Sequence, residues 1–153
     1  MKIKIKCKIN GKEEFLVGHS ISRMVDILRE NNFFSVKIGC GEGECGSCAI
    51  SFNNKLVNSC LLPLGQVEGS EIYTLEGLND DFLIKNIQRS FLKNGGTQCG
   101  ACTPGMILAI RNLLIKNKKP SRNKIVEALS GNICRCTGYV KIVDSVMSIC
   151  ILT

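Results

Sequence analysis

The stretch from residue 40 to residue 48 reads CGEGECGSC and constrains this chain more than any other part of its sequence. Cysteines, glycines, acidic residues and one serine fill it, and no bulky apolar side chain is among them. Such a stretch has nothing with which to pack a hydrophobic core. We therefore expect it to be ordered by a metal centre that its cysteines bind.

The cysteine spacing indicates which metal centre this is. Cys40, Cys45 and Cys48 follow the x4-x2 spacing of plant-type ferredoxins, and Cys60 is available as the fourth ligand of a [2Fe-2S] cluster. Structural zinc sites usually pair C-x2-C knuckles, which this triplet does not resemble. We expect Cys60 to approach from a neighbouring strand.

Glycines in and beside this loop have a predicted role in holding the cluster. Without a β-carbon they allow positive φ angles and a close approach of the backbone to sulfur. Their amides are then able to donate hydrogen bonds that stabilise an anionic cluster. The glycines expected to do so are Gly39, Gly41, Gly43 and Gly46.

A second set of cysteines lies in the other half of the chain. Cys99 and Cys102 form one pair, Cys134 and Cys136 form another, and each pair precedes a predicted helix. The helix macrodipole would stabilise thiolates at both places. The spacing by itself allows zinc or a second [2Fe-2S] cluster, whereas the run of cysteines typical of a [4Fe-4S] site is absent from the sequence.

The high cysteine content also bears on where the chain works. The sequence has 10 cysteines, but its amino terminus, MKIKIKCKINGKEEF, alternates lysine with isoleucine and contains no apolar core of a signal peptide. No apolar run approaches the roughly 20 residues of a membrane span. We expect a cytoplasmic chain without a membrane span, in which thiols stay reduced and hold metal.

A formal net charge of +7 raises the question of nucleic-acid binding. Two oxidised clusters with their thiolates would lower that charge to roughly +3. The lysines are spread along the chain, and the aromatic content of 5%, without tryptophan, offers few surfaces on which bases could stack. Nucleic acid is therefore not an expected partner.

The first half has the pattern of short strands. Residues 2–10 alternate isoleucine and cysteine with lysine, Asn10-Gly11 is a hairpin turn signal, and residues 20–31 form an amphipathic helix. A sheet crossed by one helix predicts a small β-grasp, ferredoxin-like unit of the α+β class. The other expected strands are residues 13–17, 35–39, 48–52, 55–60 and 71–77.

The second half changes to helical periodicity. Pro104 is placed for a first turn, Ser121 for an N-cap, and Gly131 for a helix stop. In the first of these helices, Phe82 is expected to lie on the apolar face. The prediction is an all-α four-helix bundle, with one domain at 1–77 and the other at 78–153. The expected helices are residues 80–95, 103–117, 120–132 and 138–150.

Taken together, GCGEGECGSC, QCGACTPG and GNICRCTGY closely resemble the small iron–sulfur subunit of the xanthine dehydrogenase and aldehyde oxidase (molybdenum hydroxylase) family. The resemblance covers essentially the whole chain. It implies a ferredoxin-like domain and a helical domain with one [2Fe-2S] cluster each. The flavin-side cluster would be held by Cys40, Cys45, Cys48 and Cys60, and the molybdenum-side cluster by Cys99, Cys102, Cys134 and Cys136.

The resemblance also implies a function. Electrons would pass from molybdopterin on a large partner subunit, through both clusters, to FAD on a medium partner subunit. The substrate would be a purine, another N-heterocycle, an aldehyde or carbon monoxide. Gln98 and Cys136 would contact the pterin. The chain ends soon after its last helix, so we expect a separate subunit without a substrate-converting site.

Some residues depart from the family pattern or remain outside it. Glu44 and Ala101 stand where glycine and a larger residue are usual, and the extra carboxylate should lower the potential of its cluster. Cys7 is in phase with buried positions and is expected to pack in the core, as is Cys150. Arg135 is expected either to place positive charge near the second cluster or to face solvent. The lone His19 is expected to be a loop residue.

Two alternatives remain at this point. One is a stand-alone two-cluster ferredoxin or a redox-sensing protein. The other is a structural zinc module in the second half.

Overall fold

The computed structural model describes the backbone of residues 2–151 and the side chains of residues 2–149. The chain begins with an antiparallel hairpin, β1 (Lys2–Ile9) and β2 (Lys12–His19). Asn10 and Gly11 form its turn with φ angles of 53° and 80°, as the turn signal predicts.

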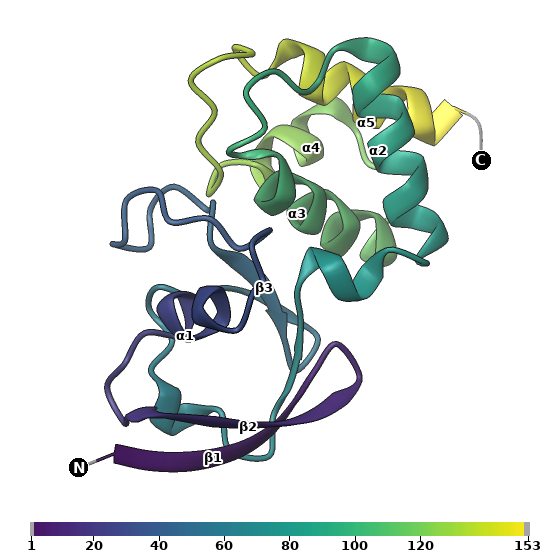
Figure 1. Ribbon diagram of the computed structural model, residues 1–153. Helices are drawn as coiled ribbons and strands as arrows, with labels where there is room; N and C mark the ends of the chain where they lie inside the picture. The colour runs from purple at the N-terminus through teal and green to yellow at the C-terminus, as the bar shows by residue number, and fades with distance from the viewer. Residues whose placement is uncertain (1, 152–153) are drawn as a thin grey trace.

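The hairpin belongs to a mixed sheet of five strands in the order β2-β1-β5-β3-β4. Strand β5 runs parallel to β1, and the other neighbouring pairs are antiparallel. The short helix α1 (Met24–Glu30) packs against one face of the sheet (Figure 1). The remaining strands are β3 (Ala49–Phe52), β4 (Lys55–Asn58) and β5 (Glu71–Tyr73), with short 3-10 turns η1 (Leu64–Gln66) and η2 (Leu75–Leu78).

The predicted strand at 35–39 is wrong. This segment is irregular, because its polar backbone groups bond to scattered partners and form no ladder. The Lys37 amide donates to the Ser47 carbonyl (3.1 Å), and the Arg29 guanidinium donates to the Val36 carbonyl (2.8 Å). The segment therefore anchors the cysteine loop that follows it.

Four helices follow the sheet, as predicted. They are α2 (Phe82–Asn94), α3 (Thr103–Lys116), α4 (Arg122–Ala128) and α5 (Val140–Ile151). Ser121 caps α4 by accepting a hydrogen bond from the Lys124 amide, and Pro104 lies in the first turn of α3. Helix α4 ends at Ala128, before Gly131. Within residues 2–151, no helix has both the length and the apolar character that a bilayer crossing would need.

Phe82 does not lie on the buried face of α2, contrary to the expectation. Its side chain is 74% exposed, whereas Ile84, Ile87 and Phe91 are buried. The reason is that Asp81 is the N-cap and Phe82 the first helical residue, so the buried apolar stripe begins two residues later, at Ile84.

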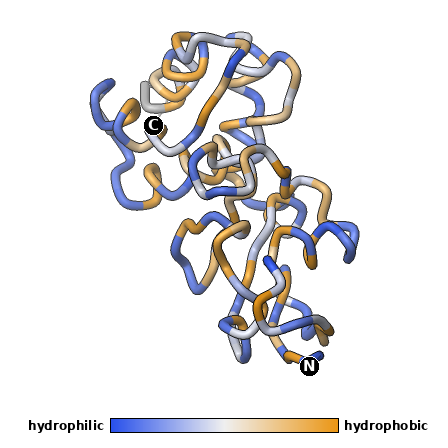
Figure 2. The backbone as a smooth tube through the Cα atoms, turned by 90° about the vertical axis from the view of Figure 1, so that its left-hand side faces the viewer, coloured by the Kyte–Doolittle hydropathy of each residue, from blue (hydrophilic) through white to orange (hydrophobic). Residues whose placement is uncertain are grey.

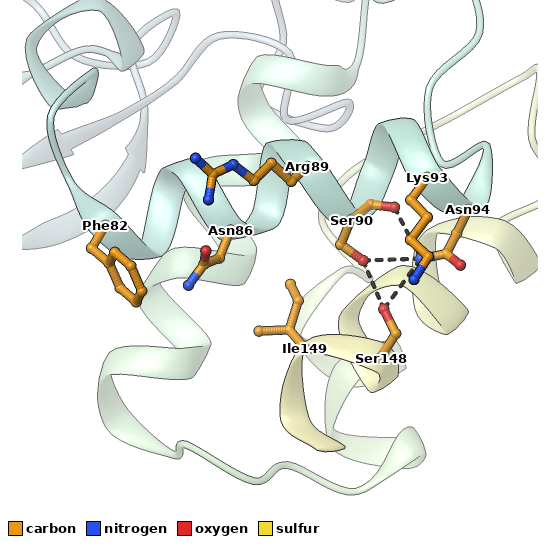
Figure 3. A pocket seen from close by; sticks show the side chains of 8 residues that line it. All are labelled: Phe82, Asn86, Arg89, Ser90, Lys93, Asn94, Ser148 and Ile149. Atoms are coloured by element: carbon orange, nitrogen blue, oxygen red, sulfur yellow. Dashed lines mark hydrogen bonds between the residues drawn. The ribbon is translucent and has the colours of Figure 1, made fainter. Parts of the chain in front are cut away.

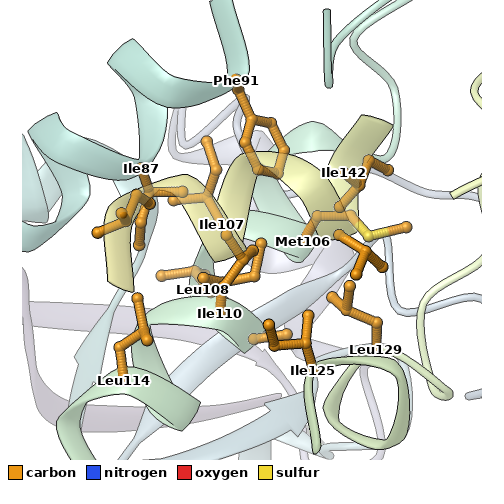
Figure 4. Packing of buried hydrophobic residues seen from close by; sticks show 14 of the residues in the cluster. Ile87, Phe91, Met106, Ile107, Leu108, Ile110, Leu114, Ile125, Leu129 and Ile142 are labelled. Atoms are coloured by element: carbon orange, nitrogen blue, oxygen red, sulfur yellow. The ribbon is translucent and has the colours of Figure 1, made fainter. Parts of the chain in front are cut away.

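Two hydrophobic clusters fill the protein. One joins α1 to the sheet, and the other joins α2, α3, α4 and α5 (Figure 4). On β4, Leu56 packs against the helical cluster while Val57 packs against the α1 cluster, because adjacent strand residues face opposite ways. Helix α1 therefore covers one face of the sheet, and α3 contacts β3 and β4 from the other side. In Figure 2 the apolar segments alternate with polar ones along both halves.

Candidate iron–sulfur sites

The cysteine loop between α1 and β3 is built to hold a thiolate at Cys40. Its sulfur accepts hydrogen bonds from the backbone amides of Glu42 (3.3 Å) and Glu44 (3.4 Å). The amide of Cys45 adds a third bond (3.4 Å), and the amide of Cys40 donates in return to the Cys45 sulfur (3.3 Å). These amide donors, that of Glu42 foremost, lower the pKa of Cys40 to about 6.

The other two cysteines of this first site are buried and close to each other. Cys60 follows the end of β4 and lies in a turn, so it does not sit on a strand as expected. Burial raises the pKa of Cys60 to about 11, and a hydrogen bond with Cys48 and the charge of Cys48 act in the same direction. Such a thiol becomes a thiolate at neutral pH only when a strong positive charge, such as that of bound metal ions, stabilises the anion.

The loop glycines act in different ways. Gly41, Gly43 and Gly46 have φ angles of 73°, 84° and 69°, as predicted. Gly39 has no positive φ, which corrects the expectation for it. Its role is a close approach, because a β-carbon there would lie 2.6 Å from the Cys45 sulfur. The amides bonded to the Cys40 sulfur belong to Glu42, Glu44 and Cys45, not to the glycines, whereas the Gly43 amide donates to the Cys60 sulfur, as predicted for a glycine.

The second site gathers the other four predicted cysteines from two segments, the loop before α3 and the loop before α5. Cys99 and Cys136 are exposed, and the Cys136 thiol donates to the Cys99 sulfur at 3.5 Å. Cys102 lies directly before α3, and its side chain forms a hydrogen bond with that of Cys134. Burial, followed by this bond and the charge of Cys134, raises the pKa of Cys102 to about 12.

Thr137 is an additional donor at the second site. Its hydroxyl donates to the Cys134 sulfur at 3.1 Å, and its amide reaches the same sulfur at 3.5 Å. Burial raises the pKa of Cys134, but these donors outweigh burial and the net shift is downward. Tyr139 braces the same loop, because its hydroxyl accepts from the Cys134 amide (2.9 Å) and donates to the Asn132 carbonyl (3.2 Å).

At both sites the sulfurs come in pairs. Among the described residues, no three His, Cys, Asp or Glu side chains close around one metal ion. A [2Fe-2S] cluster needs two thiolates on each of two irons, which is a paired arrangement and not a single tetrahedron. The paired thiols therefore fit the ligand arrangement of a two-iron cluster. The pairs are Cys40 with Cys45, Cys48 with Cys60, Cys99 with Cys136 and Cys102 with Cys134.

The two sites are joined by direct backbone contact. The Ile133 amide donates to the Cys45 carbonyl at 2.9 Å, and Ile133 immediately precedes Cys134. The buried Asn132 side chain donates to the Gly46 carbonyl at 3.3 Å. The first cysteine loop thus rests on the last loop of the helical half.

The residues expected to face partners are exposed. Gln98, Ala101 and Arg135 lie on the surface beside the exposed Cys99 and Cys136. Glu44 is exposed next to the exposed Cys40 of the first site. Arg135 therefore faces solvent in the isolated chain.

Cys7 and His19 do not belong to either site. Cys7 is 3% exposed in the α1 cluster, as predicted, and burial raises its pKa to about 11. The side chain of Cys150 lies outside the described residues. His19 is exposed at the end of β2.

A pocket of about 330 Å³ lies between α2 and α5, and none of the proposed ligand cysteines lines it (Figure 3). Ser90, Asn94 and Ser148 form a hydrogen-bonded group at one side of it. This group stabilises the contact between the two helices. None of the predicted site residues lines the pocket.

Sequence reasoning missed Thr137, Ile133, Asn132 and Arg23. The last of these lies beside the first cysteine loop, where a β-carbon on Gly41 would be 3.1 Å from its Nη1 atom. A hydroxyl residue directly after the pair of Cys134 and Cys136 gives a weak signal for Thr137. Nothing in the sequence points to the others, because their roles depend on contacts between distant segments.

Comparisons with known proteins agree with this geometry. Residues 7–71 match a family described as a 2Fe-2S iron-sulfur cluster binding domain, and residues 74–147 match a [2Fe-2S] binding domain family. The chain is 47% identical to the nicotinate dehydrogenase small FeS subunit of Eubacterium barkeri over 92% of its own length and 90% of the relative. It is 41% identical to the xanthine dehydrogenase iron-sulfur-binding subunit of Escherichia coli O157:H7, over 95% of this chain and 92% of the relative.

A solved structure shows the same arrangement. A chain of quinoline 2-oxidoreductase from Pseudomonas putida 86 matches with a TM-score of 0.91 and 38% identity, covering 98% of this chain and 94% of that one. The match extends across the sheet and the helices. The chain therefore belongs to the family of small iron–sulfur subunits of the molybdenum hydroxylases, and it is part of an oxidoreductase.

Proposed function

We propose that this chain is the electron-transfer subunit of a molybdenum hydroxylase complex. It would receive electrons from molybdopterin on a large partner subunit and deliver them to FAD on a medium partner subunit. The observation that carries this proposal is the pairing of thiols at two sites joined through the hydrogen bond from Ile133 to Cys45. Each [2Fe-2S] cluster, when bound, accepts and releases one electron at a time.

The proposed ligands follow from the pairs described above. Cys40, Cys45, Cys48 and Cys60 would hold the flavin-side cluster, and Cys99, Cys102, Cys134 and Cys136 the molybdenum-side cluster. The amides around Cys40 and the hydroxyl of Thr137 would stabilise negative charge on the sulfurs. The chain itself thus keeps the donor atoms oriented and compensates their charge.

The exposed rim of the second site is the proposed contact for the pterin. Gln98 precedes Cys99, whose sulfur lies 3.5 Å from that of Cys136. Both Gln98 and Cys136 are exposed and are therefore free to meet a partner. We assign them to the pterin contact.

The chain offers a short route between its two sites. It runs from the Cys45 side chain to its carbonyl, across the 2.9 Å hydrogen bond to the Ile133 amide, and along the backbone to Cys134. The Asn132 side chain packs against Gly46 and donates a hydrogen bond to its carbonyl beside this contact. The fold therefore fixes the spacing of the two sites.

The domain division and the setting also belong to this proposal. Residues 1–77 would form the ferredoxin-like domain and residues 78–153 the helical domain, in a cytoplasmic complex. The relatives are named for nicotinate, xanthine and nicotine, although they match this chain to similar extents. This supports a substrate that is selected by the large partner and not by this chain.

The test is metal analysis of the anaerobically purified chain, with cysteine variants as comparison. We expect about four irons and four sulfides per chain and two EPR signals of S = 1/2 after reduction. Cys60→Ser should abolish one signal and Cys102→Ser the other. Cys7→Ser is the matched control, since Cys7 is as buried as Cys60, and it should keep both signals.

Other outcomes would contradict the proposal. Two irons with bound zinc would make the second half a structural zinc module. If the chain carries both clusters but purifies from its native host without molybdenum or flavin, it is a stand-alone ferredoxin or a redox-sensing protein.

A further inference from the structure

Arg23 lies between the two segments that supply the first cysteine site. Its backbone forms an antiparallel bridge with Pro63, and the Val25 amide donates to the Ser59 carbonyl at 3.1 Å. Ser59 is the neighbour of Cys60. The start of α1 is therefore fixed to the turn that carries the fourth cysteine.

The side chain of Arg23 reaches the other segment. A β-carbon on Gly41 would lie 3.1 Å from the Arg23 Nη1 atom, so the guanidinium rests against the loop just after Cys40. The absence of a side chain at Gly41 leaves room for it. Arg23 thus touches both sides of the site while 47% of its side chain remains exposed.

Asp26 holds the guanidinium in this place. Arg23 Nε donates to one carboxylate oxygen at 2.8 Å and Nη2 donates to the other at 3.1 Å. This two-point contact fixes the plane of the guanidinium and leaves Nη1 directed toward the loop. The hydrogen bond and charge of Asp26 raise the pKa of Arg23, and the charges of Cys60 and Cys48 act in the same direction.

We infer that Arg23 is a positioning residue that raises the reduction potential of the first cluster, with Asp26 holding it in place. Reduction adds one electron, and hence one negative charge, to the cluster. A nearby cation stabilises the reduced form more than the oxidised form. The inference rests on the proposed function, because it requires a cluster at Cys40, Cys45, Cys48 and Cys60.

Other charges face the same loop and act against Arg23. Glu42 and Glu44 are exposed within it, and Asp26 lies beside the guanidinium. Among the described residues, Lys37 contacts the loop through its amide, which donates to the Ser47 carbonyl, and Arg29 bonds to the Val36 carbonyl before the loop, whereas Arg23 places its guanidinium against Gly41. Its removal should therefore leave the acidic groups uncompensated.

The test is a redox titration of the cluster-loaded chain, followed by EPR, with dithionite as the one-electron reductant. Arg23→Gln should shift the equilibrium of the first cluster toward the oxidised form by about threefold to tenfold, which is about 28 to 59 mV for one electron. Arg23→Lys should restore most of the potential. The shift should shrink at high ionic strength, because the group is partly exposed.

Asp26→Asn separates an electrostatic role from a structural one. Asparagine keeps an amide oxygen that accepts from Arg23 Nε, so the guanidinium stays against Gly41 while one anion is lost, and the potential of the first cluster should rise. If the ion pair only holds the loop together, Arg23→Gln and Asp26→Asn would move the potential in the same direction, and the inference would be wrong.

Two references make the measurement specific. Arg122→Gln removes the same charge from a similarly exposed ion pair with Asp144 and should leave the first signal unchanged. The second cluster, identified as the signal that Cys102→Ser abolishes, should not shift with Arg23→Gln. The role of Arg23 would be refuted if Arg23→Gln shifted both signals equally or shifted neither of them.

Iron and sulfide analysis distinguishes this failure from failure of the proposed function. If the unmodified chain lacks a [2Fe-2S] cluster at the first site, the proposed function fails. If the cluster is present in both the unmodified chain and Arg23→Gln at the same potential, only the inference about Arg23 fails.

Discussion

The amide of Ile133 donates a hydrogen bond to the carbonyl of Cys45 at 2.9 Å, and this contact joins two cysteine loops that are far apart in the sequence. Next to it, Gly131, Asn132 and Gly105 all approach Gly46 closely. The two sites therefore share one rigid junction. Changes at the junction should affect both the stability of the chain and the spacing of its sites.

Gly46→Ala should be strongly destabilising. Its φ is 69°, and a β-carbon would lie 2.4 Å from both the Gly131 carbonyl oxygen and the Asn132 Nδ2 atom. We expect a loss of about 3 kcal/mol in the free energy of unfolding, from left-handed strain of about 1–2 kcal/mol and overpacking of about 1–3 kcal/mol. Urea unfolding measures it.

Gly95→Ala is the control for this prediction. Gly95 has a φ of 71° but nothing within 4 Å of its β-carbon position, so only strain of about 1 kcal/mol applies. Equal losses for the two variants would show that the junction is not tightly packed.

Thr137→Val should lower the reduction potential of the second cluster. The hydroxyl donates to the Cys134 sulfur at 3.1 Å, and valine keeps the shape of the side chain without this donor. Loss of the bond disfavours the more negative, reduced form by roughly tenfold, or about 59 mV. Thr137→Ser keeps the hydroxyl and should keep the potential in an EPR-monitored titration. A potential unchanged in Thr137→Val would mean that the hydroxyl does not act on the cluster.

Glu44→Gln should raise the potential of the first cluster. The exposed carboxylate is lost, whereas the Glu44 amide still donates to the Cys40 sulfur. The shift should be small and should disappear at high salt, because exposed charges are screened. The same titration at low and high ionic strength measures it. A shift that persists at high salt would point to a rearranged loop instead.

Asp81 should contribute a pH-dependent part of the stability. Its carboxylate accepts from the Leu83 and Ile84 amides and pairs with Arg111 at 2.7 Å. Burial raises its pKa, but these partners, led by the Ile84 amide, outweigh burial and lower it below the ordinary 3.8. This stabilisation is therefore complete above the unfolded-state pKa and is lost as the pH falls through the lower folded-state pKa.

Asp81→Asn should consequently cost about 1–2 kcal/mol at neutral pH, and the difference from the unmodified chain should narrow below pH 3.8. Both chains have the same cysteines, so loss of clusters in acid cancels in this difference. Asp80→Asn is the control, since that side chain is fully exposed and should contribute nothing measurable. A difference that does not vary with pH would contradict the assigned role of Asp81.

The local patterns of the sequence were sufficient for most of the elements. The period-two alternation in residues 2–10, the Asn10-Gly11 turn and the cap at Ser121 are short-range features, and the structure confirms them. The segment at 35–39 has the composition of a strand, but a strand also needs a neighbouring strand, which the sequence pattern does not reveal. Phe82 was misplaced because the helix boundary depends on which of two aspartates becomes the cap.

The cysteine spacing by itself predicted which residues gather at each site and that a [2Fe-2S] cluster suits the first site, because ligand spacing within a loop is a local property, whereas at the second site it left zinc and a [2Fe-2S] cluster open. Only the tertiary structure decided the rest. It brought Cys134 beside Cys102, placed Arg23 against Gly41 and joined Ile133 to Cys45. These contacts arise where separate segments pack against one another, and packing depends on the shape of the whole chain and not on any one stretch of it.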